Sequence, residues 1–352
     1  MIIQTGMRTD IPAFYSEWFA NRLMEGYVLT RNPYNASQVT RYSLDPKVVD
    51  LIAFCSKNPG PMLPLLEACK EQCTPREQSS LGACCRTIST ESDNPDFASK
   101  SGLSDSMAAL LVESTYWFVT ITPYGRDYEP NVPEIDKVIE DFKAISRIVG
   151  PNSMGWRYEP IFINDIYTVE KHLEAYEHIA SELSGYTRTS VISFIDLYQK
   201  VRKNFPEARI VGKTDRLYLG EKMIKIAGSY GMIVKPCAEG KELAQFGADC
   251  RGCMTTDVYE KAIGLSMDFP KKKPLRQECE CFMGNDIGAY NTCPHLCRYC
   301  YANYDEETVR RNYRLHDPQS PFLIGGSLPE DVIHEADQKS YINGQMTLDM
   351  FL

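Results

Sequence analysis

The sequence predicts an α/β fold in which one TIM-like (β/α) barrel makes up most of the chain. Short apolar segments alternate with amphipathic ones, and strands that alternate with helices pair in parallel through right-handed crossovers. Seven or eight such units occur, which favours a closed barrel over an open sheet. No Gly-x-Gly-x-x-Gly motif follows the first strand, and this argues against a dinucleotide-binding sheet.

The strands are expected where aromatic and β-branched residues form short runs. The run YWFVTITPYG at 116–125 is the clearest example, whereas 27–33 is ambiguous. In chain order, the predicted strands are 2–7, 51–57, 116–125, 155–163, 189–198, 232–239 and 286–291.

The helices are expected where apolar residues recur every three or four positions. Val138, Ile139, Phe142 and Ile145 show this spacing within 133–148. In chain order, the predicted helices are 14–25, 133–148, 169–184 and 219–231.

Two segments depart from this alternation. Residues 67–113 are rich in Ser, Thr and Cys and have no sustained period, so we expect a mobile insertion there. The barrel, with its cysteine-rich C-terminal region, is expected to span 1–305. Residues 306–352 are expected to form a polar C-terminal tail.

Composition narrows the class of protein. The 352 residues carry a net charge of −9, which argues against coating nucleic acid by bulk charge. No apolar run approaches the roughly 18 residues of a membrane span, and the first residues lack a signal-peptide pattern, so we expect a cytoplasmic protein. The 13 cysteines are then more readily explained as metal ligands or catalysts than as disulfides.

Polar residues follow six of the predicted strands. In a (β/α) barrel the chemistry takes place at the C-terminal ends of the strands, and charges scattered by chance would fall equally at both ends. Basic side chains at those ends are suited to carboxylate or phosphate groups. The residues predicted to line the cavity are Arg8, Asp10, Lys57, Arg126, Arg157 and Glu159.

A tight cysteine motif follows the last predicted strand. Cys293, Cys297 and Cys300 are spaced C-x3-C-x2-C, and Tyr299 precedes the third cysteine. Three thiolates on one loop can hold three irons of a 4Fe-4S cluster and leave the fourth iron open. This spacing is typical of radical S-adenosylmethionine (radical SAM) enzymes, in which the methionyl group occupies the open iron. Zinc is the alternative, with His295 completing the site.

The chain resembles the prokaryotic family called domain of unknown function 1848, whose members carry a radical-SAM-like cysteine motif near the C-terminal end. The resemblance covers roughly residues 1–305 apart from 67–113. It implies a cluster-binding protein and leaves the reaction open. The matching segments are RTDIPAFY (8–15), SKNP (56–59), TITPYGRDYEPNVP (120–133), WRYEPI (156–161), GYTRTSVISFIDLY (185–198) and CECFMGNDIGAYNTCPHLCRYCYAN (279–303).

The order of the parts differs from that of ordinary radical SAM enzymes, whose cysteine loop follows the first strand. A closed barrel has no unique first strand, so a circular permutation would put this loop in an equivalent place beside 2–7. No Gly-Gly-Glu motif follows that strand. The expected cofactors are one or two 4Fe-4S clusters and S-adenosylmethionine, with ferredoxin or flavodoxin as the reductant.

Five further cysteines lie upstream of this motif. Cys250 and Cys253 form a C-x2-C pair, Cys279 and Cys281 form a C-x-C pair, and Cys237 ends a predicted strand. The best set for a second metal centre is Cys237, Cys279, Cys281 and one of Cys250 or Cys253. That centre is a closed 4Fe-4S cluster or a structural zinc, and buried thiols without a metal are the alternative.

The last eight residues resemble a sliding-clamp-interaction motif through Gln345, Leu348, Phe351 and Leu352. The alternative is that these apolar residues dock onto the barrel. The favoured interpretation is a radical SAM-type enzyme of unknown substrate, with a DNA lesion as the candidate substrate. The second interpretation is a non-catalytic iron–sulfur or zinc-binding barrel that the motif recruits to a DNA clamp.

Overall fold

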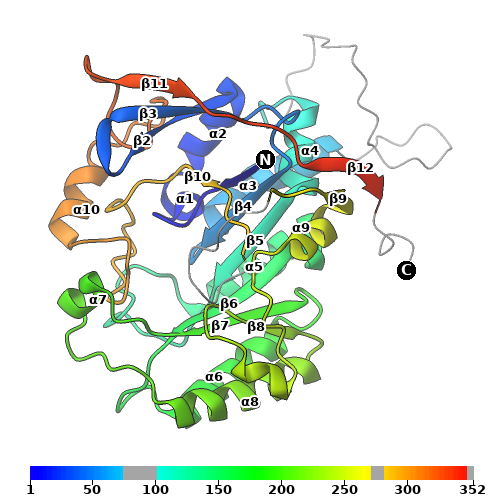
Figure 1. Ribbon diagram of the computed structural model, residues 1–352, viewed down its shortest axis with the longest axis vertical. Coiled ribbons are helices and arrows are strands. Elements are labelled where there is room, and N and C mark those ends of the chain that lie inside the picture. The colour runs from blue at the N-terminus through cyan, green and yellow to red at the C-terminus, as the bar shows by residue number, and fades with distance from the viewer. Residues whose placement is uncertain (74–100, 271–280, 347–352) are drawn as a thin grey trace.

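A computed structural model describes residues 1–73, 101–270 and 281–346, and its centre is a seven-stranded sheet (Figure 1). Every neighbouring pair of strands in this sheet is parallel. In spatial order, the strands are β10 (Asn285–Asp286), β1 (Ile2–Gln4), β4 (Leu51–Ser56), β5 (Thr115–Thr120), β6 (Met154–Ile161), β7 (Thr189–Phe194) and β8 (Ile233–Pro236).

The α/β prediction is confirmed, and the strands lie close to their predicted positions. The strands β1, β4, β5, β6, β7 and β8 have the same order in the sheet as in the chain. The last strand of the sheet in the chain, β10, returns to pair with β1. Within the described ranges β8 and β10 do not pair, so the sheet is open, whereas the sequence predicted a closed barrel. The edge strand β10 has two residues and pairs with β1 only through Asn285 and Asp286.

A layer of helices covers one face of the sheet, and α9 lies on the other, here called the inner face. Trp117 and Val119 of β5 join the core beneath the helices, whereas Tyr116 and Phe118 pack on the inner face with Tyr259 of α9. Alternate side chains of one strand therefore enter two separate cores. The α-helices are α1 (Ile11–Phe14), α2 (Ser16–Glu25), α3 (Leu63–Cys73), α4 (Asp105–Glu113), α5 (Ile135–Val149), α6 (Val169–Glu182), α7 (Gln199–Asn204), α8 (Lys213–Ser229), α9 (Thr256–Ile263) and α10 (Glu306–Tyr313).

The segment 67–113, which was expected to be a mobile insertion without sustained helices, contains helical residues at both of its ends. Helix α3 continues to Cys73, and α4 begins at Asp105, with the Ser104 side chain accepting a hydrogen bond from the Met107 N–H. Most of α4 is buried, so it lacks the polar face that makes a helix visible in a sequence. Residues 74–100 lie outside the described part of the chain.

Residues 306–346 contribute more than the polar tail that was expected. Strand β11 (Val332–Glu335) pairs with β3 (Asn35–Ser43), which in turn pairs with β2 (Tyr27–Asn32). Strand β12 (Ile342–Met346) pairs with β9 (Leu265–Met267). All four residues of β11 are exposed, so backbone pairing rather than apolar burial fixes it. Among the described helices, none is both long and apolar enough to cross a membrane.

Candidate functional site

The cysteine loop, residues 287–304, runs from β10 to α10 and lies on an aromatic cluster beyond the ends of β5, β6 and β7. Cys297 and Tyr299 are buried in this cluster, and Cys300 packs against it. Because the C-terminal ends of parallel strands meet at one edge, the loop lies where the chemistry of such folds takes place. The aromatic partners are Tyr124, Tyr128, Phe162, Tyr167 and Phe205.

The backbone of the loop curls tightly around the three thiols. Leu296 has a φ of 57°, in the left-handed region that residues with a Cβ rarely adopt. The Cys300 N–H donates to the Cys297 carbonyl at 3.0 Å, and the Asn303 side-chain amide donates to the Cys293 carbonyl at 2.8 Å. Cys297 is buried and the other two cysteines are half-buried, and removal of each thiol from water raises its pKa.

A buried carboxylate joins the cysteine loop to the first strand. Asp10 Oδ2 lies 2.8 Å from His295 Nε2, and the same oxygen accepts a hydrogen bond from the Lys57 N–H at 2.8 Å. The other oxygen of Asp10 accepts from the Ala13 N–H and caps α1. His295 Nδ1 lies 3.2 Å from the carbonyl of Asn131, so both ring nitrogens have partners.

A second buried carboxylate, Glu129, joins the loop to two further strand ends. Its Oε1 lies 2.9 Å from Lys57 Nζ and accepts hydrogen bonds from the hydroxyls of Thr122, at 2.7 Å, and Tyr299. Burial opposes the charge of Lys57, but the attraction of Glu129 keeps the pKa of this lysine above its ordinary value. Lys57 and Glu129 therefore form an ion pair beneath the loop.

Arg157 and Glu159 form another ion pair farther along the inner face. Arg157 Nη1 lies 2.5 Å from Glu159 Oε1, and the Ser193 hydroxyl donates to Glu159 Oε2 at 3.2 Å. The guanidinium also lies over the Phe118 ring, 4.3 Å from its centre. Its Nε is buried and has no hydrogen-bond partner among the residues that the structure describes.

The structure separates the predicted cavity residues into groups. Asp10 and Lys57 contact each other and the cysteine loop, whereas Arg157 and Glu159 pair with each other. Arg8 reaches the start of the loop, where its Nη1 lies 3.5 Å from the carbonyl of Gly288.

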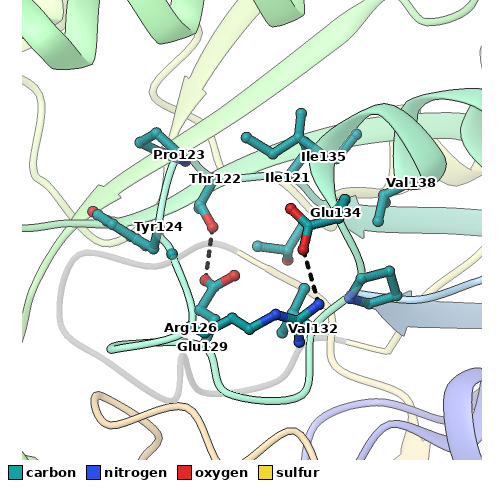
Figure 2. Close-up of a pocket in the computed structure, with 13 residues that line it drawn as sticks. Ile121, Thr122, Pro123, Tyr124, Arg126, Glu129, Val132, Glu134, Ile135 and Val138 are labelled. Atoms are coloured by element: carbon teal, nitrogen blue, oxygen red, sulfur yellow. Dashed lines mark hydrogen bonds and ion pairs between the residues drawn. The ribbon is translucent and has the colours of Figure 1, made fainter.

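Arg126 lies apart from these groups. Its side chain is 63% exposed and pairs with Glu134 at 2.8 Å on the wall of a small pocket (Figure 2). The pocket also includes Thr122 and Glu129 and has a volume of about 140 Å³, below the range of about 300–1,000 Å³ typical of ligand sites.

The structure brings together Cys237, Cys253 and Cys281 from the second cysteine set. Cys250 packs instead against the core under the helices, and Cys279 lies outside the described residues. In the part of the chain that the structure describes, no group of three or more His, Cys, Asp or Glu side chains is placed to hold a metal ion.

Sequence reasoning did not select Glu129, Cys55 or Glu239 as site residues. Cys55 lies on the inner face, where burial raises the pKa of its thiol to about 12. Glu239 accepts a hydrogen bond from the Phe194 N–H at 2.8 Å, and burial raises its pKa to about 7. Glu129 and Glu239 both follow predicted strands, and that position is the one signal that pointed to them.

The clamp-like motif falls mostly beyond the described residues. Gln345 belongs to β12, whose backbone pairs with β9. Leu348, Phe351 and Leu352 lie outside the described part of the chain.

Comparison with known proteins gives one match. A family model described as "Domain of unknown function (DUF1848)" matches residues 2–88 and 99–302, which is most of the chain. No curated protein and no solved structure matches the chain.

Proposed function

The chain belongs to the DUF1848 family, and on that premise we propose that it is an iron–sulfur enzyme of the radical SAM type. Cys293, Cys297 and Cys300 would hold three irons of a 4Fe-4S cluster, with Tyr299 packed beside them. The observation that carries the proposal is the placement of three closely spaced cysteines, one buried and two half-buried, in one loop at the C-terminal edge of a parallel sheet.

The donor set of the loop fits such a cluster better than it fits zinc. A zinc ion normally takes four ligands, and His295 is the residue within the loop that would complete them. Both nitrogens of His295 already have partners, Asp10 and the Asn131 carbonyl. Three soft sulfur donors without a fourth protein ligand suit a cluster with one open iron.

The strand order supports a permuted partial barrel as the fold. Read from β10, the sheet runs β10, β1, β4, β5, β6, β7, β8 with all strands parallel. The cysteine loop therefore follows an edge strand, and β1 is the next strand inward. In an ordinary radical SAM barrel the cysteine loop follows the first strand. A circular permutation that starts the chain at the second strand would give the order seen here, with β10 in the place of the first strand and β1 in the place of the second.

The residues around the loop have roles that follow from their contacts. Asp10 and Glu129 position the loop by holding His295 and Tyr299. Arg8 and Arg157 place guanidinium groups at β1 and β6, where they would bind a carboxylate or phosphate of the cosubstrate or substrate. When bound, the cluster would supply the electron that cleaves the sulfonium of S-adenosylmethionine.

Anaerobic turnover tests the proposal. The protein is reconstituted with iron and sulfide, reduced with flavodoxin or dithionite, and incubated with S-adenosylmethionine, and 5′-deoxyadenosine is quantified. We expect the wild type to form 5′-deoxyadenosine and Cys297→Ser to form none. Cys69→Ser is the control, because Cys69 is buried on α3, in the core beneath the helices. An intact cluster that does not cleave S-adenosylmethionine would contradict the proposed enzymatic activity and favour the non-catalytic interpretation.

DNA and a sliding clamp remain the proposed substrate and partner on the strength of the sequence. The clamp is tested by pull-down with the full chain and with a chain lacking residues 345–352. Loss of binding on truncation supports the motif, and equal binding excludes it. Tyr301 and Tyr304 belong to the loop, are exposed, and offer rings on which a base could stack.

A further inference from the structure

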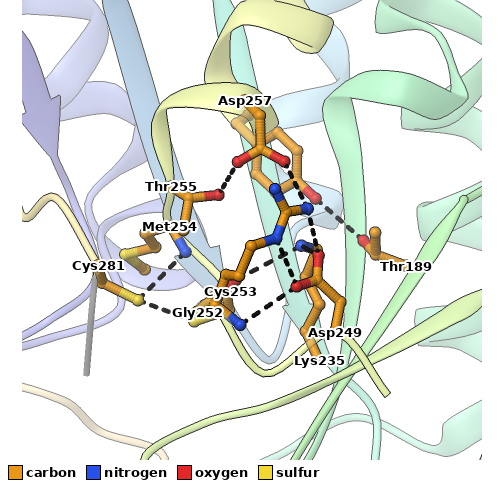
Figure 3. Close-up of polar contacts among 11 residues, drawn as sticks. Thr189, Lys235, Asp249, Gly252, Cys253, Met254, Thr255, Asp257 and Cys281 are labelled. Atoms are coloured by element: carbon orange, nitrogen blue, oxygen red, sulfur yellow. Dashed lines mark hydrogen bonds and ion pairs between the residues drawn. The ribbon is translucent and has the colours of Figure 1, made fainter. Parts of the chain in front are cut away.

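A second group of thiols lies on the inner face, away from the cysteine loop. Cys237 follows β8, Cys253 precedes α9, and Cys281 precedes β10. The sulfurs of Cys253 and Cys281 are 3.7 Å apart, and a dashed line marks their contact in Figure 3. Cys237 packs against the same inner-face cluster, near the thiol of Cys253.

Hydrogen-bond donors point at these sulfurs. The Met254 N–H donates to Cys281 Sγ at 3.3 Å, and Arg157 Nη2 lies 3.6 Å from Cys253 Sγ. Backbone and cationic donors to sulfur are the contacts that support metal-bound thiolates. A cysteine buried as a small apolar residue needs neither contact.

The backbone before α9 is shaped around the same sulfurs. Gly252 has a φ of +119°, and a Cβ at this position would lie 3.1 Å from Cys281 Sγ. Asp249 holds the start of this turn through an ion pair of 2.5 Å with the buried Lys235 (Figure 3). The turn is therefore fixed in a conformation that brings Cys253 against Cys281.

We propose that Cys237, Cys253 and Cys281 bind a zinc ion at a site separate from the cysteine loop. Two thiolates on a tetrahedral zinc, each with a Zn–S bond of about 2.3 Å, have sulfurs about 3.8 Å apart, close to the 3.7 Å between Cys253 and Cys281. A 4Fe-4S cluster holds each cysteine on a different iron and spaces the sulfurs farther apart. As the structure describes them, the three side chains are not placed to hold a metal ion, so binding requires Cys237 and Cys281 to turn toward one point beside Cys253. It leaves one coordination position for another ligand.

The proposal does not depend on the cluster, so it is tested without the cluster ligands. In the full chain carrying Cys293→Ser, Cys297→Ser and Cys300→Ser, we expect about one zinc per molecule by elemental analysis. Adding Cys253→Ser and Cys281→Ser should remove the zinc. Adding Cys250→Ser instead is the matched control and should retain it, because Cys250 packs on the other side of the sheet.

Cobalt gives a second readout that does not require the loop variant to fold. Zinc-free wild type titrated with Co²⁺ should develop the sulfur-to-cobalt absorption of a tetrahedral thiolate site, and Cys253→Ser should lose it while Cys250→Ser keeps it. Absence of zinc from the loop variant, iron and sulfide in its place, or a metal-free Cys253–Cys281 disulfide would each overturn the proposal. These results would leave the cluster at Cys293, Cys297 and Cys300 unaffected, so the two claims can fail separately.

Discussion

Asp10 and His295 form a hydrogen bond of 2.8 Å although 285 residues separate them in the sequence. Both are almost fully buried, and Asp10 also accepts the Lys57 N–H. One carboxylate thus connects the ends of β1 and β4 to the loop that carries the three cysteines. The loop is therefore held by the sheet edge as well as by its own short-range hydrogen bonds.

Removing this link should destabilise the protein. His295→Ala is expected to lower the free energy of unfolding by about 1–3 kcal/mol, because it removes one hydrogen-bond partner of the buried Asp10. His334→Ala is the control, since His334 lies on the exposed strand β11 and should change stability little. Urea unfolding of both variants measures the difference, and equal stabilities would show that the link contributes nothing.

The buried ion pair of Lys57 and Glu129 should matter more than a surface pair. Glu129→Ala leaves the Lys57 ammonium without its carboxylate and is expected to cost about 3–5 kcal/mol of unfolding free energy. The matched control is Glu134→Ala, which breaks the exposed pair with Arg126 and should cost no more than about 1 kcal/mol. Thermal and urea denaturation compare the two, and a similar loss in both would refute a special role for Glu129.

Gly6 should not tolerate a side chain. A Cβ at this position would lie 2.2 Å from the carbonyl oxygen of Cys55, which is backbone and cannot move aside. Gly6→Ala is therefore expected to destabilise the protein by more than about 1 kcal/mol. Gly228→Ala in α8 meets no atom within 4 Å and should stabilise it by up to about 1 kcal/mol. Chemical denaturation showing the same sign for both changes would contradict this packing.

Glu239 should make stability depend on pH. Burial raises its pKa from 4.5 to about 7, so the folded protein binds more protons than the unfolded chain between these values. The free energy of unfolding should therefore fall as pH rises from 4.5 to 7, by at most about 3 kcal/mol, and then level off. Glu239→Gln should lack this slope. Parallel stability curves for wild type and variant would exclude Glu239 as its source.

The central sheet could be predicted because its strands are apolar and short. The predicted 51–57 and 189–198 correspond to β4 (Leu51–Ser56) and β7 (Thr189–Phe194). Strands β3 and β11 could not be predicted, because they pair through the backbone and carry mostly polar or exposed side chains. An apolar periodicity appears in a sequence only where an element buries one face, and these two strands bury few side chains.

The grouping of site residues could be predicted only in part. Asp10 and Lys57 follow neighbouring parallel strands, and that position implies that they lie near each other. Arg126 follows β5 as well, but its loop turns outward to Glu134, and no local pattern reveals that direction. Cys55 looked like one apolar residue of a buried strand, because its neighbours on the inner face come from distant parts of the chain.

The most direct test of the central claim is the iron and acid-labile sulfide content after anaerobic reconstitution. The wild type is compared with the chain that carries serine at positions 293, 297 and 300. We predict that the triple substitution removes about four irons and four sulfides per molecule, the content of one 4Fe-4S cluster. Equal iron and sulfide in the two proteins, or none in the wild type, would contradict the assignment of Cys293, Cys297 and Cys300 as the cluster ligands.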